Sequence, residues 1–156
     1  MLAKAMTMMD CVRLPARALA LAFLAAALSG PAAADDDAPM GKDGLPTYIV
    51  KDNQVDRGTY NGYRRFHSVC HTCHGFDAAG GSFAPSLVDS LKRLSYDDFK
   101  EVVINGRQVA GATGDRVMPS FGTDPNVVQH LDDIYRYLKA RADGALPGGR
   151  PQRIGS

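Results

Sequence analysis

The sequence contains no apolar run long enough to cross a membrane. Its longest run, from Ala18 to Leu28, is eleven residues, whereas a membrane helix needs about 20. An excess of one charge is missing too: residues 35–156 hold fifteen basic and sixteen acidic residues, a net charge of −1 with neutral histidines. Binding to nucleic acid relies on a basic excess. We therefore expect neither an integral membrane protein nor a nucleic-acid-binding protein.

Residues 1–34 have the pattern of a secretory signal peptide. Three basic residues and one acidic residue lie there, the apolar run follows, and the segment ends at Ala32-Ala33-Ala34. No lipobox cysteine follows the apolar run, so a lipid anchor is not indicated. We place cleavage after Ala34 and expect a soluble protein in the periplasm. Its 122 residues are enough for one compact core.

The remaining chain divides by composition into an arm, a folded domain and a tail. Residues 35–57 are rich in Asp, Gly and Pro, with one short extended candidate at Thr47 to Val50. We interpret them as a flexible acidic arm that lies across the domain surface at most. Residues 143–156 are equally poor in helix and strand formers and are expected to be a disordered tail. The folded domain is predicted at residues 58–142.

Helical periodicity predicts three main helices in this domain. The first covers about residues 59–69. The second opens at Ser95, a capping residue, and ends at Asn105-Gly106. The third covers residues 124–141, with an aspartate cap followed by proline. Because no strand alternation of useful length and no internal repeat is present, the expected fold class is all-α.

Two long glycine-rich loops separate these helices, at residues 75–85 and 106–123. Loops of this length are uncommon in a small domain unless they serve a site. The three helices also carry few large apolar residues, so the side chains alone make a thin core. We expect a bound group to complete it.

The strongest chemical signal is the segment Cys70-His71-Thr72-Cys73-His74. Two thiols separated by two residues can reach two vinyl groups on one edge of a porphyrin. The histidine that follows can then offer its imidazole to the iron, and this spacing is typical of c-type haem attachment. We predict one haem, attached covalently through Cys70 and Cys73, with His74 as an axial ligand.

Three other interpretations of the cysteine pair remain as alternatives. A thioredoxin-like dithiol would need a strand before it, whereas a helix is predicted there. A structural zinc site would need a second pair of ligands, and residues 35–156 contain no further cysteine. A disulfide is usual in an exported protein, but it would leave His74 and the long loops unexplained.

The opposite face of the iron needs either a second ligand or an open position. Residues 35–156 offer two methionines, Met40 and Met118, and two histidines outside the motif, His67 and His130. Met118 lies in a glycine-rich loop and precedes a proline, so its thioether can be held over the iron. Met/His ligation raises the reduction potential relative to two imidazoles. We predict Met118 as the second ligand, with a gap-filling methionine as the alternative, and the two histidines as surface or packing residues.

Residues 58–141 as a whole resemble the class I monohaem cytochromes c. Gly62 and Phe66 look like the glycine and aromatic pair of that family's first helix, which packs against the last helix at positions matching Ile134 and Tyr137. The resemblance implies a cytochrome c fold, with about three main helices and long loops around a covalently bound haem. It also implies an electron-transfer protein and not an enzyme.

Two loops extend this resemblance. The segment Phe83-Ala84-Pro85-Ser86-Leu87 is similar to the family's proline loop. That similarity implies that the Pro85 carbonyl accepts the Nδ1 proton of His74 and so fixes the ring. The segment Met118-Pro119-Ser120-Phe121 resembles the axial methionine loop.

A narrower resemblance concerns residues 58–69 and 87–96. They are similar to small periplasmic cytochromes of methanol metabolism, which are themselves like the cytochrome cL-type acceptors of pyrroloquinoline-quinone (PQQ) alcohol dehydrogenases. This resemblance implies a quinoprotein methanol or alcohol dehydrogenase, calcium- or lanthanide-dependent, as electron donor, and a downstream cytochrome or terminal oxidase as acceptor. We expect a monomer.

Two further functions remain open. One is the haem subunit of a larger dehydrogenase complex, in which the acidic arm would be the docking element. The other is a five-coordinate haem that acts as an enzyme or binds a gas, with Met118 not coordinated.

Overall fold

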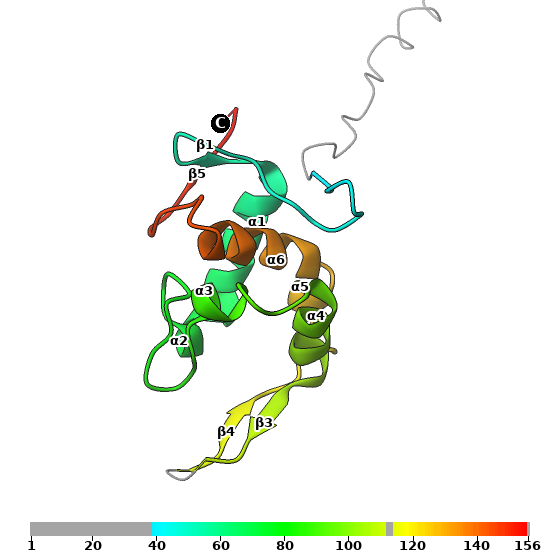
Figure 1. Ribbon diagram of the computed structural model, residues 1–156, viewed down its shortest axis with the longest axis vertical. Coiled ribbons are helices and arrows are strands. Elements are labelled where there is room, and N and C mark those ends of the chain that lie inside the picture. The colour runs from blue at the N-terminus through cyan, green and yellow to red at the C-terminus, as the bar shows by residue number, and fades with distance from the viewer. Residues whose placement is uncertain (1–38, 112–113, 156) are drawn as a thin grey trace, which may run out of the picture. The chain divides into compact units, whose positions relative to one another are not determined.

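The computed structural model describes residues 39–111 and 114–155, so the expected signal peptide and its cleavage site lie outside the described residues. None of the helices in the described ranges is long and apolar enough to cross a membrane. The elements follow one another along the chain as β1 (Val50–Lys51), β2 (Gln54–Val55), α1 (Arg57–Val69), α2 (His71–His74), α3 (Leu87–Ser90), α4 (Tyr96–Asn105), β3 (Arg107–Val109), β4 (Arg116–Met118), α5 (Pro125–Val128), α6 (Leu131–Ala142) and β5 (Gln152–Arg153) (Figure 1).

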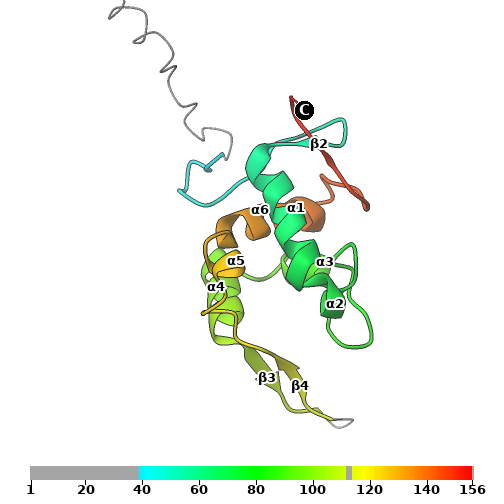
Figure 2. The ribbon, with the colours of Figure 1, turned by 180° about the vertical axis from the view of Figure 1, so that it is seen from behind.

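Helices α1 and α6 pack against each other at the centre of the domain (Figure 2). Gly62 makes this possible, because a Cβ atom built on it would lie 1.8 Å from the backbone oxygen of Asp133. One turn further along α1, the ring of Phe66 lies 5.4 Å from that of Tyr137, and both side chains are fully buried. The predicted packing of Gly62 and Phe66 against the last helix is therefore confirmed.

The first two predicted helices begin where local capping places them. The Asp56 carboxylate accepts a hydrogen bond from the Thr59 amide (2.9 Å) and starts α1. The Ser95 hydroxyl accepts one from the Asp98 amide (3.1 Å) and starts α4, which ends before Gly106 as expected. Each cap satisfies an amide that has no partner inside the helix.

The third predicted helix is interrupted, which corrects the expectation of one helix over residues 124–141. Helix α5 stops at Val128, and His130 leaves the helical region with φ −124° and ψ 22°. The Asn61 amide of α1 donates to both the His130 ring (3.1 Å) and the Asp133 carboxylate (2.8 Å). These contacts join the start of α6 to α1 at the residue where the helix is interrupted.

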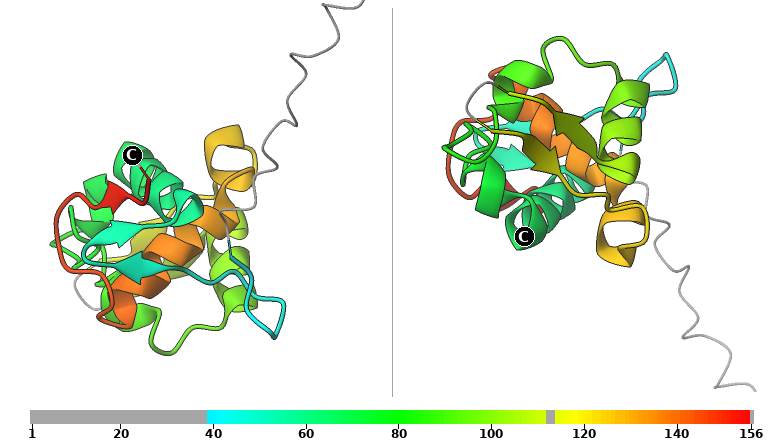
Figure 3. Two further views of the ribbon diagram at one scale, coloured as in Figure 1. Left: turned by 90° about the horizontal axis from the view of Figure 1, so that it is seen from above. Right: turned by 90° about the horizontal axis from the view of Figure 1, so that it is seen from below.

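The all-α class with about three helices is not confirmed, because the described residues form six helices and two small sheets. Strand β1 pairs antiparallel with β2, and β5 pairs parallel with β2 (Figure 3). Strands β3 and β4 form a two-stranded hairpin. All five strands have two or three residues, too few for a pattern of alternating apolar residues to be recognised in the sequence.

The expected flexible arm makes defined contacts from residue 39 onwards. The Arg136 side chain of α6 is only 4% exposed. Its guanidinium donates to the carbonyl oxygens of Thr47 (3.0 Å) and Pro39 (3.2 Å) and pairs with Asp133 (3.0 Å). A buried guanidinium is tolerated only when its donors find partners. The arm supplies them, and this ties residues 39–47 to α6.

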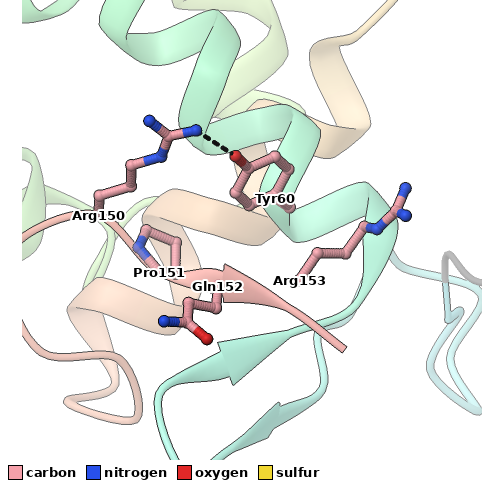
Figure 4. Close-up of a pocket in the computed structure, with 5 residues that line it drawn as sticks. All are labelled: Tyr60, Arg150, Pro151, Gln152 and Arg153. Atoms are coloured by element: carbon pink, nitrogen blue, oxygen red, sulfur yellow. Dashed lines mark hydrogen bonds between the residues drawn. The ribbon is translucent and has the colours of Figure 1, made fainter. Parts of the chain in front are cut away.

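The tail, expected to be disordered, also makes defined contacts. Leu146 is buried, and β5 extends the sheet of the arm. Arg150 donates a hydrogen bond to the Tyr60 hydroxyl (2.8 Å) at the side of a pocket lined by Tyr60, Arg150, Pro151, Gln152 and Arg153 (Figure 4). None of these residues belongs to the Cys70–His74 segment, so this pocket is separate from the predicted site.

Candidate functional site

Cys70 joins α1 to α2 without leaving helical geometry. Its φ and ψ are −82° and −31°, and its amide donates to the carbonyl of Phe66 (2.8 Å). The His74 amide in turn donates to the Cys70 carbonyl (3.1 Å). The helical path places both thiols and the histidine at the end of α1, with Cys70 half-buried, Cys73 exposed and His74 only 7% exposed.

The His74 ring is oriented by a single backbone contact. Its Nδ1 lies 3.0 Å from the carbonyl oxygen of Pro85. Since a carbonyl oxygen can only accept, Nδ1 carries the proton and Nε2 keeps a free lone pair. Metal-ligating histidines commonly donate their other ring nitrogen in this way. The structure thus brings together the two residues that the family resemblance paired.

The loop that carries Pro85 is anchored to α6 by residues that the sequence analysis did not identify. The Arg141 guanidinium donates to the carbonyl of Asp77 (3.1 Å), and the Asp77 carboxylate accepts from the Gly149 amide (2.8 Å). Closer to the motif, the Gly80 amide donates to the His74 carbonyl (2.8 Å). Arg141 and Asp77 are 64 positions apart, and no local signal in the sequence connects them.

The state of the two thiols tests the alternatives to haem attachment. Both cysteines are free, so they do not form a disulfide. Burial, reinforced by the nearby Cys73 and Asp124 side chains, raises the pKa of the Cys70 thiol to about 11. A redox-active dithiol needs a lowered thiol pKa, because the thiolate is the nucleophile. Within residues 39–111 and 114–155, no group of three or more His, Cys, Asp or Glu side chains is arranged to hold a metal ion. The structure supports none of the three alternatives.

Met118 is the last residue of β4, where the sequence predicted a loop. The hairpin of β3 and β4 leaves the helices at the same end of the described residues as α2 (Figures 1 and 2). Gly106, at φ 76°, allows the turn into the hairpin: a Cβ atom there would lie 2.7 Å from the Met118 oxygen. Beyond Met118, the Ser120 hydroxyl donates to the Ile104 carbonyl. This hydrogen bond ties the segment to the end of α4, although no hydrogen bond of the described residues joins it to α2.

The other candidate ligands from the sequence have packing contacts of their own. The His67 ring lies 4.1 Å from the Tyr63 ring on α1. His130 is held by Asn61, as described above. The Met40 sulfur accepts a hydrogen bond from Arg136 (3.2 Å). Each of the three side chains therefore has a partner within the protein, and His67 and His130 were expected to be surface or packing residues.

The surroundings of the motif suit a porphyrin. Two phenylalanines in the loop after the motif are poorly covered by protein, Phe76 at 72% exposed and Phe83 at 80%. Exposed apolar surface of this kind marks a binding site for an apolar group or partner. Two free thiols, an imidazole nitrogen with a free lone pair and this apolar surface together fit covalently attached haem.

Comparisons with known proteins agree with this site. The family model described as cytochrome C oxidase, cbb3-type, subunit III, matches residues 59–138. Cytochrome c-553I of Paracoccus denitrificans is 46% identical over 110 residues, which cover 70% of this chain and 49% of the relative. The match thus spans about half the length of that protein. Cytochrome c-555 of Methylococcus capsulatus is 41% identical over 100 residues, which cover 64% of this chain and 75% of the relative.

A solved structure agrees with the fold. The crystal structure of c-type cytochrome XoxG from Methylobacterium extorquens AM1 has a TM-score of 0.69 and 44% identity, covering 76% of this chain and 72% of that chain. The matched family range, residues 59–138, starts within α1, contains the Cys70–His74 motif and ends within α6. Cytochromes c carry covalently attached haem c and transfer electrons. The chain therefore belongs to the cytochrome c family, as a class I cytochrome c with the cytochrome c fold.

Proposed function

We propose that this cytochrome is an exported, monomeric one-electron carrier with a single haem. In this proposal it accepts electrons from a quinoprotein methanol or alcohol dehydrogenase and passes them to a downstream cytochrome or terminal oxidase. The hydrogen bond between His74 and Pro85 beside two free thiols is the observation that carries the haem site. The similarity of residues 58–69 and 87–96 to cytochromes of methanol metabolism, and the 44% identity to XoxG, support the choice of donor.

The residues that would hold the haem have distinct tasks. Cys70 and Cys73 would form the thioether bonds, and the Nε2 atom of His74 and the sulfur of Met118 would be the axial ligands. When bound, the haem supplies the one-electron couple of its iron. The Pro85 carbonyl keeps the proton on Nδ1 of His74 and makes the ring a better donor. With His74 and Met118 both holding the iron, the haem would serve electron transfer and not bind a substrate.

Docking to redox partners would use the surface around the motif. Thr72 and Cys73 are both exposed at the end of the motif. Lys92, in the turn after α3, is paired with Asp89 (3.0 Å), which reduces its value for attracting an acidic partner. Small interfaces of modest strength are normal for redox encounters. We therefore propose an apolar contact with little electrostatic steering.

Export is proposed on the sequence of residues 1–34 alone. A basic start, an apolar run of eleven residues and three alanines at the exit are the features that support a signal peptide cleaved after Ala34. Export would place the carrier in the periplasm, where the proposed donor would reach it.

Replacement of Met118 by alanine tests the axial ligand. The wild-type holoprotein should show the weak sulfur-to-iron charge-transfer band in its oxidised visible spectrum, and Met118→Ala should lose it. The variant should also bind carbon monoxide rapidly and have a lower reduction potential, because a thioether ligand favours the reduced iron. Met40→Ala is the matched control and should leave the band intact. A wild-type protein without the band that binds carbon monoxide rapidly would instead indicate a five-coordinate haem.

The proposed donor is tested by stopped-flow mixing of the oxidised holoprotein with reduced quinoprotein dehydrogenases. A methanol dehydrogenase should reduce it, and the observed rate of reduction should rise with dehydrogenase concentration and then level off. This rate should change only a few-fold between low and moderate salt. A dehydrogenase of unrelated cofactor chemistry is the control. Failure of every quinoprotein tested would contradict the donor, and a fall of about a thousandfold with salt would contradict apolar docking. Stable co-purification with a dehydrogenase would favour a subunit of a larger complex.

A further inference from the structure

Two histidines outside the predicted haem ligands share one face of the helix that leads into the motif. His67 and His71 are four positions apart, and Cys70 between them keeps helical dihedral angles. Their ring centroids are 5.9 Å apart and their planes are inclined by 17°. Histidines at this spacing on a helix lie on the same face and can bind one metal ion together.

One ring nitrogen of His67 has a backbone partner. Its Nδ1 lies 2.8 Å from the carbonyl oxygen of Tyr63. Because that oxygen accepts, Nδ1 is the protonated nitrogen and Nε2 has a free lone pair. His74 makes the same kind of contact with Pro85, and it is the usual outer contact of a metal-bound histidine.

The ring of His71 is held by packing alone. Its Nδ1 is buried and has no hydrogen-bond partner. The ring rests against Phe76, with centroids 5.0 Å apart, and against His67. Nδ1 therefore makes no hydrogen bond that fixes the ring. The ring can turn slightly toward His67 without breaking a hydrogen bond of Nδ1.

The distance between the rings suits a shared metal ion. Two imidazoles bound to one ion through bonds of about 2.0–2.1 Å have centroids roughly 5 to 6 Å apart, and the observed separation is 5.9 Å. The rings are stacked, so their in-plane lone pairs run side by side, and the His71 ring has to turn before both can reach one ion. Imidazole nitrogen is a good ligand for Zn²⁺, Cu²⁺ and Ni²⁺, whereas Mg²⁺ and Ca²⁺ require oxygen ligands. We propose that His67 and His71 form a site for one divalent transition-metal ion, with water in the remaining positions. The site is independent of the proposed electron donor.

Titration of the haem-loaded protein with Zn²⁺ tests this site. Calorimetry should show saturable binding of one Zn²⁺ per chain. His67→Gln and His71→Gln should each weaken binding by about 10–100-fold, the loss that even an outer partner of a metal ligand causes. His130→Gln is the matched control, because it removes a histidine elsewhere in the domain, and it should bind like the wild type. Zn²⁺ should raise the melting temperature of the wild type and the control only.

A second measurement decides the question without any substitution. Cu²⁺ bound to the wild-type holoprotein should give an electron paramagnetic resonance spectrum with two equivalent nitrogen ligands.

The visible haem spectrum of each variant shows whether it has folded. If His67→Gln disturbs the packing on Tyr63, His71→Gln still tests the site. Wild-type protein that binds no Zn²⁺, or His67→Gln and His71→Gln variants that bind it as tightly as the control, would overturn the proposal.

Discussion

A double variant, Cys70→Ser with Cys73→Ser, is expected to lose its haem and to fail to fold. Serine has almost the volume of cysteine but cannot form a thioether, so the change removes the covalent bonds with little change in shape. The apolar surfaces of Phe76 and Phe83 are poorly covered by the chain itself. When a bound group supplies folding free energy, its removal unfolds the domain. The expected loss is most of the roughly 5–15 kcal/mol that stabilises an ordinary domain.

Two measurements check this result. Haem staining after denaturing electrophoresis reports the covalent bond, and far-ultraviolet circular dichroism reports the helices. Thr72→Ser is the matched control, because it changes the exposed residue between the cysteines and keeps both thiols. It should retain the haem and the helical signal. A stable, helical domain without haem from the double variant would refute the interpretation that the fold depends on this group.

Gly62→Ala is expected to destabilise the holoprotein by about 3 kcal/mol or more, the upper part of the range for overpacking. Its Cβ would lie 1.8 Å from the backbone oxygen of Asp133 and 2.4 Å from the carbonyl carbon. Neither atom can move like the end of a flexible side chain, so α1 and α6 must separate. Their contact buries Phe66 and Tyr137, and separation would loosen both.

The expected loss of stability in Gly62→Ala is opposite to the usual effect of this substitution in a helix. In a helix with nothing facing it, replacing glycine by alanine stabilises by up to about 1 kcal/mol. Here we expect the melting temperature to fall by about 10–20 °C, which follows from the usual relation between free energy and melting temperature for domains near this size. Arg64→Ala, on the exposed side of the same helix, is the control and should change the melting temperature little. An unchanged or higher value for Gly62→Ala would contradict the close approach of the two helices.

The correct parts of the sequence prediction rest on local interactions. The cap at Ser95 joins residues three positions apart, so the start of α4 was recognised without the fold. The Asp56 cap of α1 is equally local but was not recognised, and that helix was expected to start at about residue 59. The contact of His74 with Pro85 spans eleven positions. It was expected only because the chain resembles a known family, since spacing alone does not indicate which carbonyl the ring meets.

The incorrect parts depend on contacts between distant segments. The sequence pattern is continuous over residues 124–141, but Asn61 binds His130 and interrupts the helix. The low-complexity arm and tail were expected to be flexible. The buried Arg136 guanidinium binds the arm 89 positions away at Thr47, and the sheet joins the tail to β2. Composition reports what a segment can form alone and does not report what a distant partner supplies.

The sequence by itself determined the chemistry of this protein: one haem-attachment motif, the candidate ligands His74 and Met118, and the helices that local caps begin. Only the tertiary structure decided how this chemistry is held in place. It placed Met118 in a hairpin fastened to α4 and anchored the Pro85 loop to α6 through Arg141. The physical reason is the range of the interactions, because caps and motifs act within one or two turns, whereas loops are positioned by buried partners far away in the chain.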